Sequence, residues 1–348
     1  MKNQRNRSII LIVGLGSIGK THLIFALKNF GEVYIVDPSE HVMRYIYDHP
    51  ESDRMKYFAK LEALPIGSAF DLTVIANWGP DHAATLRQLV TLGNQNYIVE
   101  KPLTSRIKDL LEMKDLVSNQ EVKIVCNLTW SYSHFFEKVK EIEKKYDLGK
   151  VQNILVSGGA KCLVTNGIHY VGLALHIFEE SPEEVIALTH NSEINPRSPK
   201  LLFLDGSSTW GFSGNRYLNI SFSNNSHLQL SSVLNYSTAR LVIEGNHATL
   251  YKISKENVSK IDKSTRTFLA TEKTNEFNPF IDSDGSDGTS NIYKKFLSGE
   301  DWDDFKHGEQ ATEAIFGMLI SSQTGTKISL PLSEENIITY QNHEWNIS

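Results

Sequence analysis

The feature that most constrains the fold is a glycine pattern near the start of the chain. Residues 14–19 read Gly-Leu-Gly-Ser-Ile-Gly. They follow the apolar run of residues 9–13 and precede a stretch with helical apolar periodicity over residues 23–30. In this context the first glycine permits a tight turn, the second lets a pyrophosphate approach the backbone, and the third lets helix and strand pack closely. The pattern predicts the first strand–turn–helix of a dinucleotide-binding domain.

An acidic residue lies where such a domain contacts a ribose. Residues 33–36 predict the second strand, and Asp37 ends it. Its carboxylate can accept hydrogen bonds from ribose hydroxyls, and its charge would repel a 2′-phosphate. We therefore expect NAD as the cofactor, with NADP still possible because Ser39 could help to hold a phosphate. The pyrophosphate would lie at the helix N-terminus, against Gly14, Gly16, Ser17, Ile18 and Gly19.

Strands and helices alternate over the rest of the first third. Alternation of this kind predicts a parallel sheet covered on both faces. We expect Asp81 to cap the helix that follows the third strand. The further strands are expected at residues 72–76, 97–99 and 122–125, with another helix over residues 107–117.

Past residue 126 the pattern changes. Strands dominate from about residue 185 to residue 253, and their alternating polarity predicts an antiparallel sheet with one covered face. We expect helices over residues 135–146, 168–178 and 308–321, strands at 152–156, 217–223 and 227–231, turns at 205–208 and 213–215, and a loop at 282–288. The fold class is therefore an α/β Rossmann domain over residues 1–126, followed by an α+β domain over residues 127–348 with a large, mostly antiparallel open sheet.

Composition limits the partners and the compartment. The 348 residues are 40% hydrophobic and 22% charged, as in a folded globular protein. The net charge of −6 comes with no large basic block, so nothing indicates nucleic acid. No run approaches the ~20 apolar residues that span a bilayer. With only two cysteines, Cys126 and Cys162, a reducing compartment is the simpler interpretation, and we expect a cytoplasmic protein without membrane partners.

A lysine lies at the end of the fourth strand, where ligands bind in open parallel sheets. Residues 97–103 read Tyr-Ile-Val-Glu-Lys-Pro-Leu, and Pro102 ends the strand directly after Lys101. A partly desolvated lysine beside a nicotinamide cation can exchange a proton near neutral pH. The alternative is a surface lysine next to a strand-ending proline, and spacing alone does not separate the two.

Together these motifs resemble the glucose–fructose oxidoreductase, inositol dehydrogenase and MocA family over nearly the whole chain. The resemblance is carried by the glycine pattern, Asn77 with Pro80 and His82, the Glu100-Lys101-Pro102 triplet, Asn127 after the fifth strand, Gly158-Gly159, and residues 165–169, Thr-Asn-Gly-Ile-His. It implies hydride transfer between a nicotinamide and a carbon of a sugar, polyol or nucleotide-linked sugar. It also implies a homodimer or homotetramer formed through the open sheet.

The resemblance assigns roles residue by residue. Lys101 would contact the reacting hydroxyl and take part in proton transfer, and Glu100 would lie near the nicotinamide ribose. Residues that would line the cofactor cleft are Asn77, Pro80, His82 and Asn127. His169 would be the second acid/base, since an imidazole titrates near pH 6.5, and Thr165 and Asn166 would join Lys101 and His169 around the substrate.

The chain departs from the family at two carboxylates. The family's second catalytic segment often reads Asp-x-Gly-x-His-x-x-Asp, and here Thr165 and Gly172 replace both acids. A carboxylate beside a histidine holds its tautomer and stabilises the imidazolium, so this loss puts the chemistry in question. His169 and His176 could share a helix face, but no nearby cysteine or carboxylate completes a metal site, and we expect none.

Two aromatic residues and a lysine are open to more than one interpretation. Trp130 and Tyr132 stand where the family has an arginine, and they could stack on a sugar or pack in the core. Lys161, close after Gly159, could meet an anionic substrate group. Two other functions stay open: a lyase or hydrolase that oxidises its sugar transiently and keeps its NAD, or a non-enzymatic NAD(P)-binding sugar-sensing regulator, as in a galactose-regulon repressor with this fold.

Overall fold

The computed structural model describes residues 8–119, 121–192, 195, 199–261, 269–280 and 287–347. By proximity of the backbone, the chain forms two compact units. The first comprises residues 1–128, 289–312 and 334–348, and the second comprises residues 129–288 and 313–333. The predicted boundary after residue 126 lies close to the first crossing between the units. The return of residues 289–312 and 334–348 to the first unit has no counterpart in the sequence pattern.

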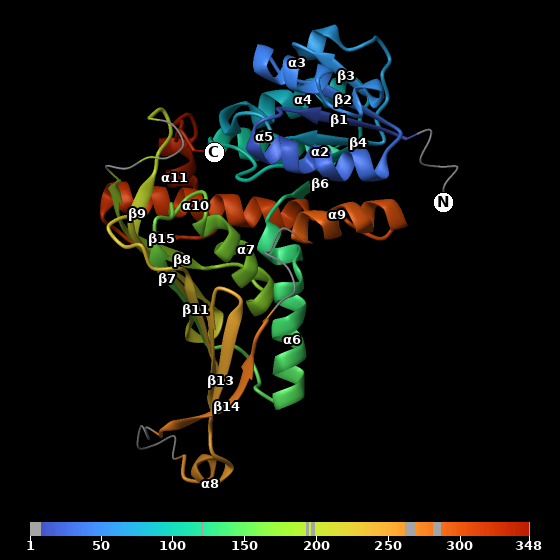
Figure 1. Cartoon of the computed structure of the whole chain (residues 1–348). Coiled ribbons are helices and arrows are strands. Elements are labelled where there is room, and N and C mark those ends of the chain that lie inside the picture. Colours follow the sequence, from blue (N-terminus) through green and yellow to red (C-terminus); the bar gives the residue numbers. More distant parts are fainter. Residues whose placement is uncertain are drawn as a thin grey trace. The chain divides into compact units, whose positions relative to one another are not determined.

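The first unit is built on a six-stranded parallel sheet (Figure 1). Its spatial order is β3 (Met55–Phe58), β2 (Glu32–Val36), β1 (Ile9–Val13), β4 (Leu72–Ile75), β5 (Asn96–Val99), β6 (Lys123–Cys126). This is the order of a Rossmann fold, in which the order of the strands reverses between β1 and β4 and a crevice opens at their carboxyl ends. Strand β1, Ile-Ile-Leu-Ile-Val, is buried almost throughout, as expected for a strand covered on both faces.

Six helices and three 3-10 turns accompany this sheet in the described part of the first unit. They are α2 (Ser17–Asn29), α3 (Glu40–Tyr47), α4 (His82–Thr91), α5 (Ile107–Asn119), α9 (Asp287–Ser298) and α11 (Glu334–Tyr340), with 3-10 turns η1 (Ser52–Arg54), η2 (Leu61–Ala63) and η3 (Gly79–Asp81). The apolar stripe of α2 is buried as predicted, through Leu23, Ala26 and Leu27. Asp81 directly precedes α4, but the expected cap is wrong, because its side chain makes no capping hydrogen bond. Helix α10 (Phe305–Thr324) begins in the first unit and ends in the second.

The second unit holds a nine-stranded sheet among its described residues. Its order is β14 (Thr271–Phe277), β13 (His247–Ile253), β12 (Ala239–Glu244), β11 (Ser231–Asn235), β7 (Asn153–Gly159), β10 (Arg216–Ser223), β9 (Leu204–Phe212), β8 (Glu184–Asn191), β15 (Ile328–Ser329). Only the pairing of β7 with β10 is parallel among these strands, so the predicted antiparallel character is confirmed. The other elements are α6 (His134–Tyr146), α7 (Gly167–Phe178), α8 (Lys255–Val258), η4 (Thr129–Tyr132) and η5 (Ser213–Asn215).

Two predictions about this sheet are wrong. Residues 205–208 are not a turn but lie inside β9, where Asp205 to Ser208 pair with β8. Residues 227–231 are not a strand, since only Ser231 belongs to β11. The turn at 213–215 is present as η5. Residues 281–286, which include most of the loop expected at 282–288, lie outside the described residues.

One face of the nine-stranded sheet is packed and the other is open. Inward side chains such as Val185, Leu218 and Ile220 are buried. Helix α7, buried over most of its length, packs on β10 and η4. Within the part of the chain that the structure describes, no helix has the length and apolar content to cross a membrane.

Candidate functional site

The turn between β1 and α2 has a different reason for each of its three glycines. Gly14 has a φ of +88°, and a Cβ there would lie 2.5 Å from the backbone of Asn77. A Cβ on Gly19 would lie 2.1 Å from the carbonyl oxygen of Gly14. A Cβ on Gly16 would meet no heavy atom within 4 Å. Two glycines therefore serve the fold, while the third keeps a surface open for a ligand.

The N-terminus of α2 is exposed at this open surface. Gly16 is its N-cap residue, no side chain caps the helix, and no acidic side chain lies in its first turn. Gly16, Ser17 and Ile18 are all exposed. Free N–H groups of a first helical turn and the helix dipole attract an anion. The residues predicted to hold a pyrophosphate thus present main-chain donors to solvent.

Asp37 is held beside this turn. One carboxylate oxygen, Oδ2, accepts the N–H of Leu15 at 2.8 Å, and Oδ1 accepts the N–H of Ser39 at 2.9 Å. The side chain is 9% exposed. Each oxygen keeps acceptor capacity beyond its main-chain bond. The carboxylate is thereby fixed in orientation and retains the means to accept a ribose hydroxyl.

Asn77 follows β4 and offers an unsatisfied polar atom. Its amide nitrogen donates to Thr85 Oγ1 at 2.9 Å. Its Oδ1 is buried and has no hydrogen-bond partner among the described residues. A buried acceptor without a donor is costly unless a ligand satisfies it. Together with the space left by Gly16, it fits a dinucleotide bound at the carboxyl ends of β1 and β4.

His82 connects the two loops that flank this crevice. It is buried, with Nδ1 3.0 Å from the carbonyl oxygen of Pro102 and Nε2 3.3 Å from that of Asn77. Burial lowers its pKa, so the ring is neutral near pH 7. A neutral ring carries one N–H, so His82 donates a hydrogen bond to only one of these two carbonyls at a time. The lining role expected for His82, and for the half-exposed Pro80 in η3, stays a prediction.

Glu100 lies at the centre of a buried hydrogen-bond network at the end of β5. Its Oε1 accepts the Asn127 amide at 2.7 Å and lies 3.0 Å from His22 Nε2. Its Oε2 accepts the main-chain N–H of Lys101 at 3.3 Å. Burial alone would raise the pKa of Glu100, but the hydrogen bond and charge of His22, the charge of Lys101 and the hydrogen bond from Asn127 outweigh it and lower the pKa to about 2.

The network continues into the late segment of the first unit. His22 Nδ1 lies 3.0 Å from the Tyr293 hydroxyl, and the Thr289 hydroxyl donates to Asn127 Oδ1 at 3.1 Å. Both ring nitrogens of His22 therefore have a hydrogen-bond partner. Burial, followed by the charge of Glu100, raises the pKa of Tyr293 well above its ordinary value, so the phenol stays protonated.

Sequence reasoning missed His22, Thr289 and Tyr293. The only local signal was a histidine on the otherwise apolar face of α2, three residues after Gly19. A polar side chain in such a stripe requires a buried partner. Tyr293 lies 271 residues away in the sequence, so no local pattern pairs the two.

The predicted substrate residues of the second unit cluster around the start of α7. Thr165 is buried, and Asn166, the residue before the helix, accepts the Cys162 N–H through Oδ1 at 3.0 Å. His169, two residues into the helix, is partly exposed. These three residues belong to the second unit, whereas Lys101 and the cofactor residues belong to the first.

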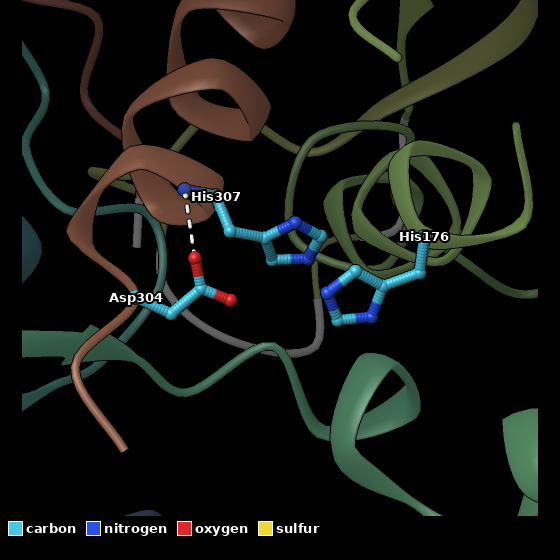
Figure 2. Close-up of side chains that lie close together, drawn as sticks. All are labelled: His176, Asp304 and His307. Carbon is cyan, nitrogen blue, oxygen red and sulfur yellow. Dashed lines mark hydrogen bonds between the residues drawn. The ribbon is translucent and has the colours of Figure 1, made fainter. Parts of the chain in front are cut away.

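His176, one of the three residues drawn in Figure 2, fixes η4 within the second unit. Its Nδ1 lies 3.0 Å from the carbonyl oxygen of Ser131, and its ring meets Tyr132 edge-on. Asp304 and His307, also in Figure 2, belong to the first unit, where the His307 N–H donates to Asp304 Oδ1 at 3.3 Å at the start of α10. Of the two aromatic residues whose role the sequence left open, Tyr132 packs against His176 of α7 and Trp130 stacks on Tyr170.

Comparison with known proteins finds a family model that matches the first unit. Residues 9–128 match the GFO_IDH_MocA family, described as an oxidoreductase family with an NAD-binding Rossmann fold. A search of the curated proteins finds no match.

Solved structures match nearly the whole chain. The chain is similar to the super-repressor mutant of Gal80p from Saccharomyces cerevisiae (14% identity, TM-score 0.72, 93% of this chain and 98% of that chain). It is similar to the WlbA dehydrogenase from Bordetella pertussis in complex with NADH and UDP-GlcNAcA (16%, 0.72, 94% and 99%). It is also similar to an oxidoreductase from Agrobacterium radiobacter in complex with NAD+, L-tartaric acid and magnesium (13%, 0.71, 92% and 98%). Residues 9–128 thus match the NAD-binding Rossmann model of this oxidoreductase family, and the chain over nearly its whole length has the fold of these solved proteins.

Proposed function

We propose that this protein is an NAD-dependent oxidoreductase that transfers a hydride between the nicotinamide and a secondary alcohol or ketone carbon of a sugar, polyol or nucleotide-linked sugar. One observation carries the proposal. Lys101 lies at the carboxyl end of β5, in the same unit as the open pyrophosphate turn, and its main-chain N–H is bonded to the buried Glu100. The similarity to a dehydrogenase solved with NADH and UDP-GlcNAcA supports a sugar-derived substrate.

The chain's own residues would divide the work. NAD, when bound, supplies the hydride acceptor or donor. The first turn of α2 would bind its pyrophosphate, and Asp37 would accept a ribose hydroxyl. Lys101 would accept the proton of the reacting hydroxyl on its neutral amine, or return it from the ammonium form in the reverse direction, and His169 is the second candidate for that proton. Glu100 would orient Lys101 through the main chain.

Replacing the lysine tests the proposal. Lys101→Ala should lower turnover about 10²–10⁴-fold, the usual contribution of one acid/base group, while the Kd for NAD stays within a factor of about two. Turnover is followed as NADH absorbance with a panel of sugars, polyols and nucleotide sugars, and NAD binding by calorimetry. Lys60→Ala, at an exposed position in the same unit, is the control. Normal turnover in Lys101→Ala would remove the lysine from the mechanism.

The preference for NAD over NADP is tested at Asp37. Asp37→Asn removes the charge but keeps an acceptor for one of the two main-chain N–H groups. We expect weaker NAD binding and an NADP/NAD affinity ratio raised about tenfold, because the repulsion of a 2′-phosphate is lost. Asp53→Asn, exposed in η1, is the matched control. An unchanged ratio would show that Asp37 does not contact the ribose.

A second candidate function is a non-enzymatic, NAD-binding sugar sensor. It is favoured by Thr165 and Gly172, where the carboxylates of the family's second catalytic segment are replaced, and by the similarity to a Gal80p repressor variant. A sensor would bind NAD and a sugar without turnover in either direction. A lyase or hydrolase with transient oxidation would instead turn over without stoichiometric NADH, so the absorbance assay combined with product analysis separates the three.

We further propose that two copies of the chain associate through the open face of the nine-stranded sheet. The apolar side chains on this face are Leu155 (37% exposed), Ile186 (50%), Leu188 (70%) and Tyr217 (39%). Exposed apolar side chains on the open face of a sheet are candidates for an interaction site. A reducing, cytoplasmic compartment is part of the same proposal, because Cys126 and Cys162 are both buried free thiols.

A further inference from the structure

A pocket of about 420 Å³ lies entirely within the second unit. Its aromatic wall comes from η4, the start of α6 and α7. Trp130 stacks on Tyr170 with ring centroids 6.4 Å apart, and Phe135 meets Trp130 edge-on at 5.3 Å. Rings that hold one another in this way present a preformed apolar surface. The volume is in the range of about 300–1,000 Å³ that is typical of small-molecule sites.

The opposite wall depends on the glycine pair at the end of β7. A Cβ on Gly159 would lie 1.8 Å from the Ser226 carbonyl oxygen, and one on Gly158 would lie 3.1 Å from Leu230 Cα. Only glycine therefore lets residues 226–230 cross the strand in direct backbone contact, where the Gly159 N–H donates to the Leu228 carbonyl at 3.0 Å. This crossing brings Gln229 and Leu230 into the pocket lining, and it explains why these residues do not continue β11.

The charge that lines the pocket is positive. Lys161 is the only charged side chain among the described lining residues, and no carboxylate of the described part of the chain pairs with it. The chain turns at Ala160, which has a φ of +52°, directly before this lysine. Burial raises the pKa of Tyr170, so this phenol adds no negative charge. The pocket is thus complementary to an anion.

The kind of anion follows from the donors. A single ammonium group is a point charge that suits one carboxylate, whereas a phosphate dianion usually meets arginines or several donors. Gln229 and Asn246 line the same pocket and offer amide groups of the kind that bind hydroxyls. An aromatic wall, one cation and two amides together suit a hydroxylated ring that carries a carboxylate.

We propose that this pocket binds a sugar acid, with its carboxylate on Lys161, its ring against Trp130, and its hydroxyls on the amides of Gln229 and Asn246. Calling that sugar acid the substrate of hydride transfer rests on the function proposed above. Its binding to the pocket does not.

The test uses the full chain with saturating NAD. Calorimetry measures binding of D-glucuronate and D-galacturonate, with D-glucose and D-galactose as the matched neutral sugars. At least one acid should bind about tenfold or more tightly than its neutral partner, and its affinity should fall with added salt. Lys161→Gln should lose that advantage. Lys150→Gln, at an exposed position in the same unit, should keep it. Trp130→Ala should weaken binding of the acid and of the neutral sugar alike, with thermal unfolding confirming that each variant is folded.

Failure of this inference is distinct from failure of the proposed function. If no uronate binds at millimolar concentration, if acids and neutral sugars bind equally, or if Lys161→Gln keeps the preference, the pocket assignment is overturned. If the acid binds through Lys161 but NADH is never formed or consumed, the pocket assignment stands and the oxidoreductase function falls. If a neutral sugar is turned over equally by Lys161→Gln and the unsubstituted protein, the oxidoreductase function stands and the pocket assignment falls.

Discussion

Glu100 has an unusual environment for a carboxylate, since it is 6% exposed and surrounded by the donors of three residues. Such a group stays ionised only because those donors replace the water that burial removes. The donors come from α2, from the residue after β6 and from the main chain of Lys101 itself. The position of the lysine is thereby coupled to the helix that carries the pyrophosphate turn.

This carboxylate should make stability depend on pH. Its pKa falls from 4.5 to about 2 on folding, so its contribution is complete above pH 4.5 and is lost as the pH falls toward 2. Glu100→Gln should lower the free energy of unfolding at pH 7 by up to about 3 kcal/mol, with the difference shrinking between pH 4.5 and 2. Urea unfolding at several pH values measures it, with exposed Glu121→Gln as control. A difference that does not change with pH would refute the assignment.

At the residue scale, the sequence predicted the positions whose roles depend on the local glycine pattern and the strand that follows it. Gly14 and Gly19 have the steric roles that the fingerprint assigns to them, and Asp37 lies beside the turn. His22 and Tyr293 could not be paired in advance, because their contact depends on how the late segment folds back. The buried position of His82 likewise follows from two carbonyl groups that no motif specifies.

At the element scale, the turn between β1 and α2 separates stability from binding. Gly16→Ala adds a methyl group to open space, at a backbone φ of −66° that alanine adopts, so the fold should be unchanged while NAD affinity falls at least tenfold. Gly19→Ala puts its methyl group against the Gly14 carbonyl and should destabilise the fold by about 1–3 kcal/mol. Thermal unfolding and NAD titration of both variants measure this, and similar behaviour of the two would contradict the division of roles.

Elements with a strong apolar periodicity could be predicted from the sequence, whereas segments whose conformation depends on contacts with neighbouring strands could not. Five strands of the parallel sheet and helices α2, α5, α6 and α7 appear close to their predicted positions, whereas the edge strand β3 was not predicted. Residues 205–208 have the composition of a turn, yet β8 pairs with all four of them and β10 pairs with Gly206 to Ser208, which keeps them extended. At residues 227–230 the polarity alternates as in a strand, but the glycines of β7 hold this segment across the sheet end instead.

At the scale of the whole molecule, the open sheet face predicts the oligomeric state. Ile186→Glu combined with Leu188→Glu should convert a dimer into a monomer, because two charges would have to be desolvated at the interface. Light scattering after size exclusion measures the mass. Ile338→Glu, at an exposed isoleucine of α11 in the first unit, should leave the mass unchanged. A double variant that stays dimeric would place the interface elsewhere.

The late return of the chain to the first unit has a consequence for how this protein is made. The Ile124 N–H donates to Asp303, the Leu103 N–H donates to Thr312, and the Trp345 N–H donates to Ser105. A ribosome therefore begins the nucleotide-binding half first and finishes it last, after every strand of the other half has been synthesised. A nascent chain released before residue 289 would leave the N–H groups of Leu103 and Ile124 and the Nδ1 of His22 without the partners that residues 289–312 supply.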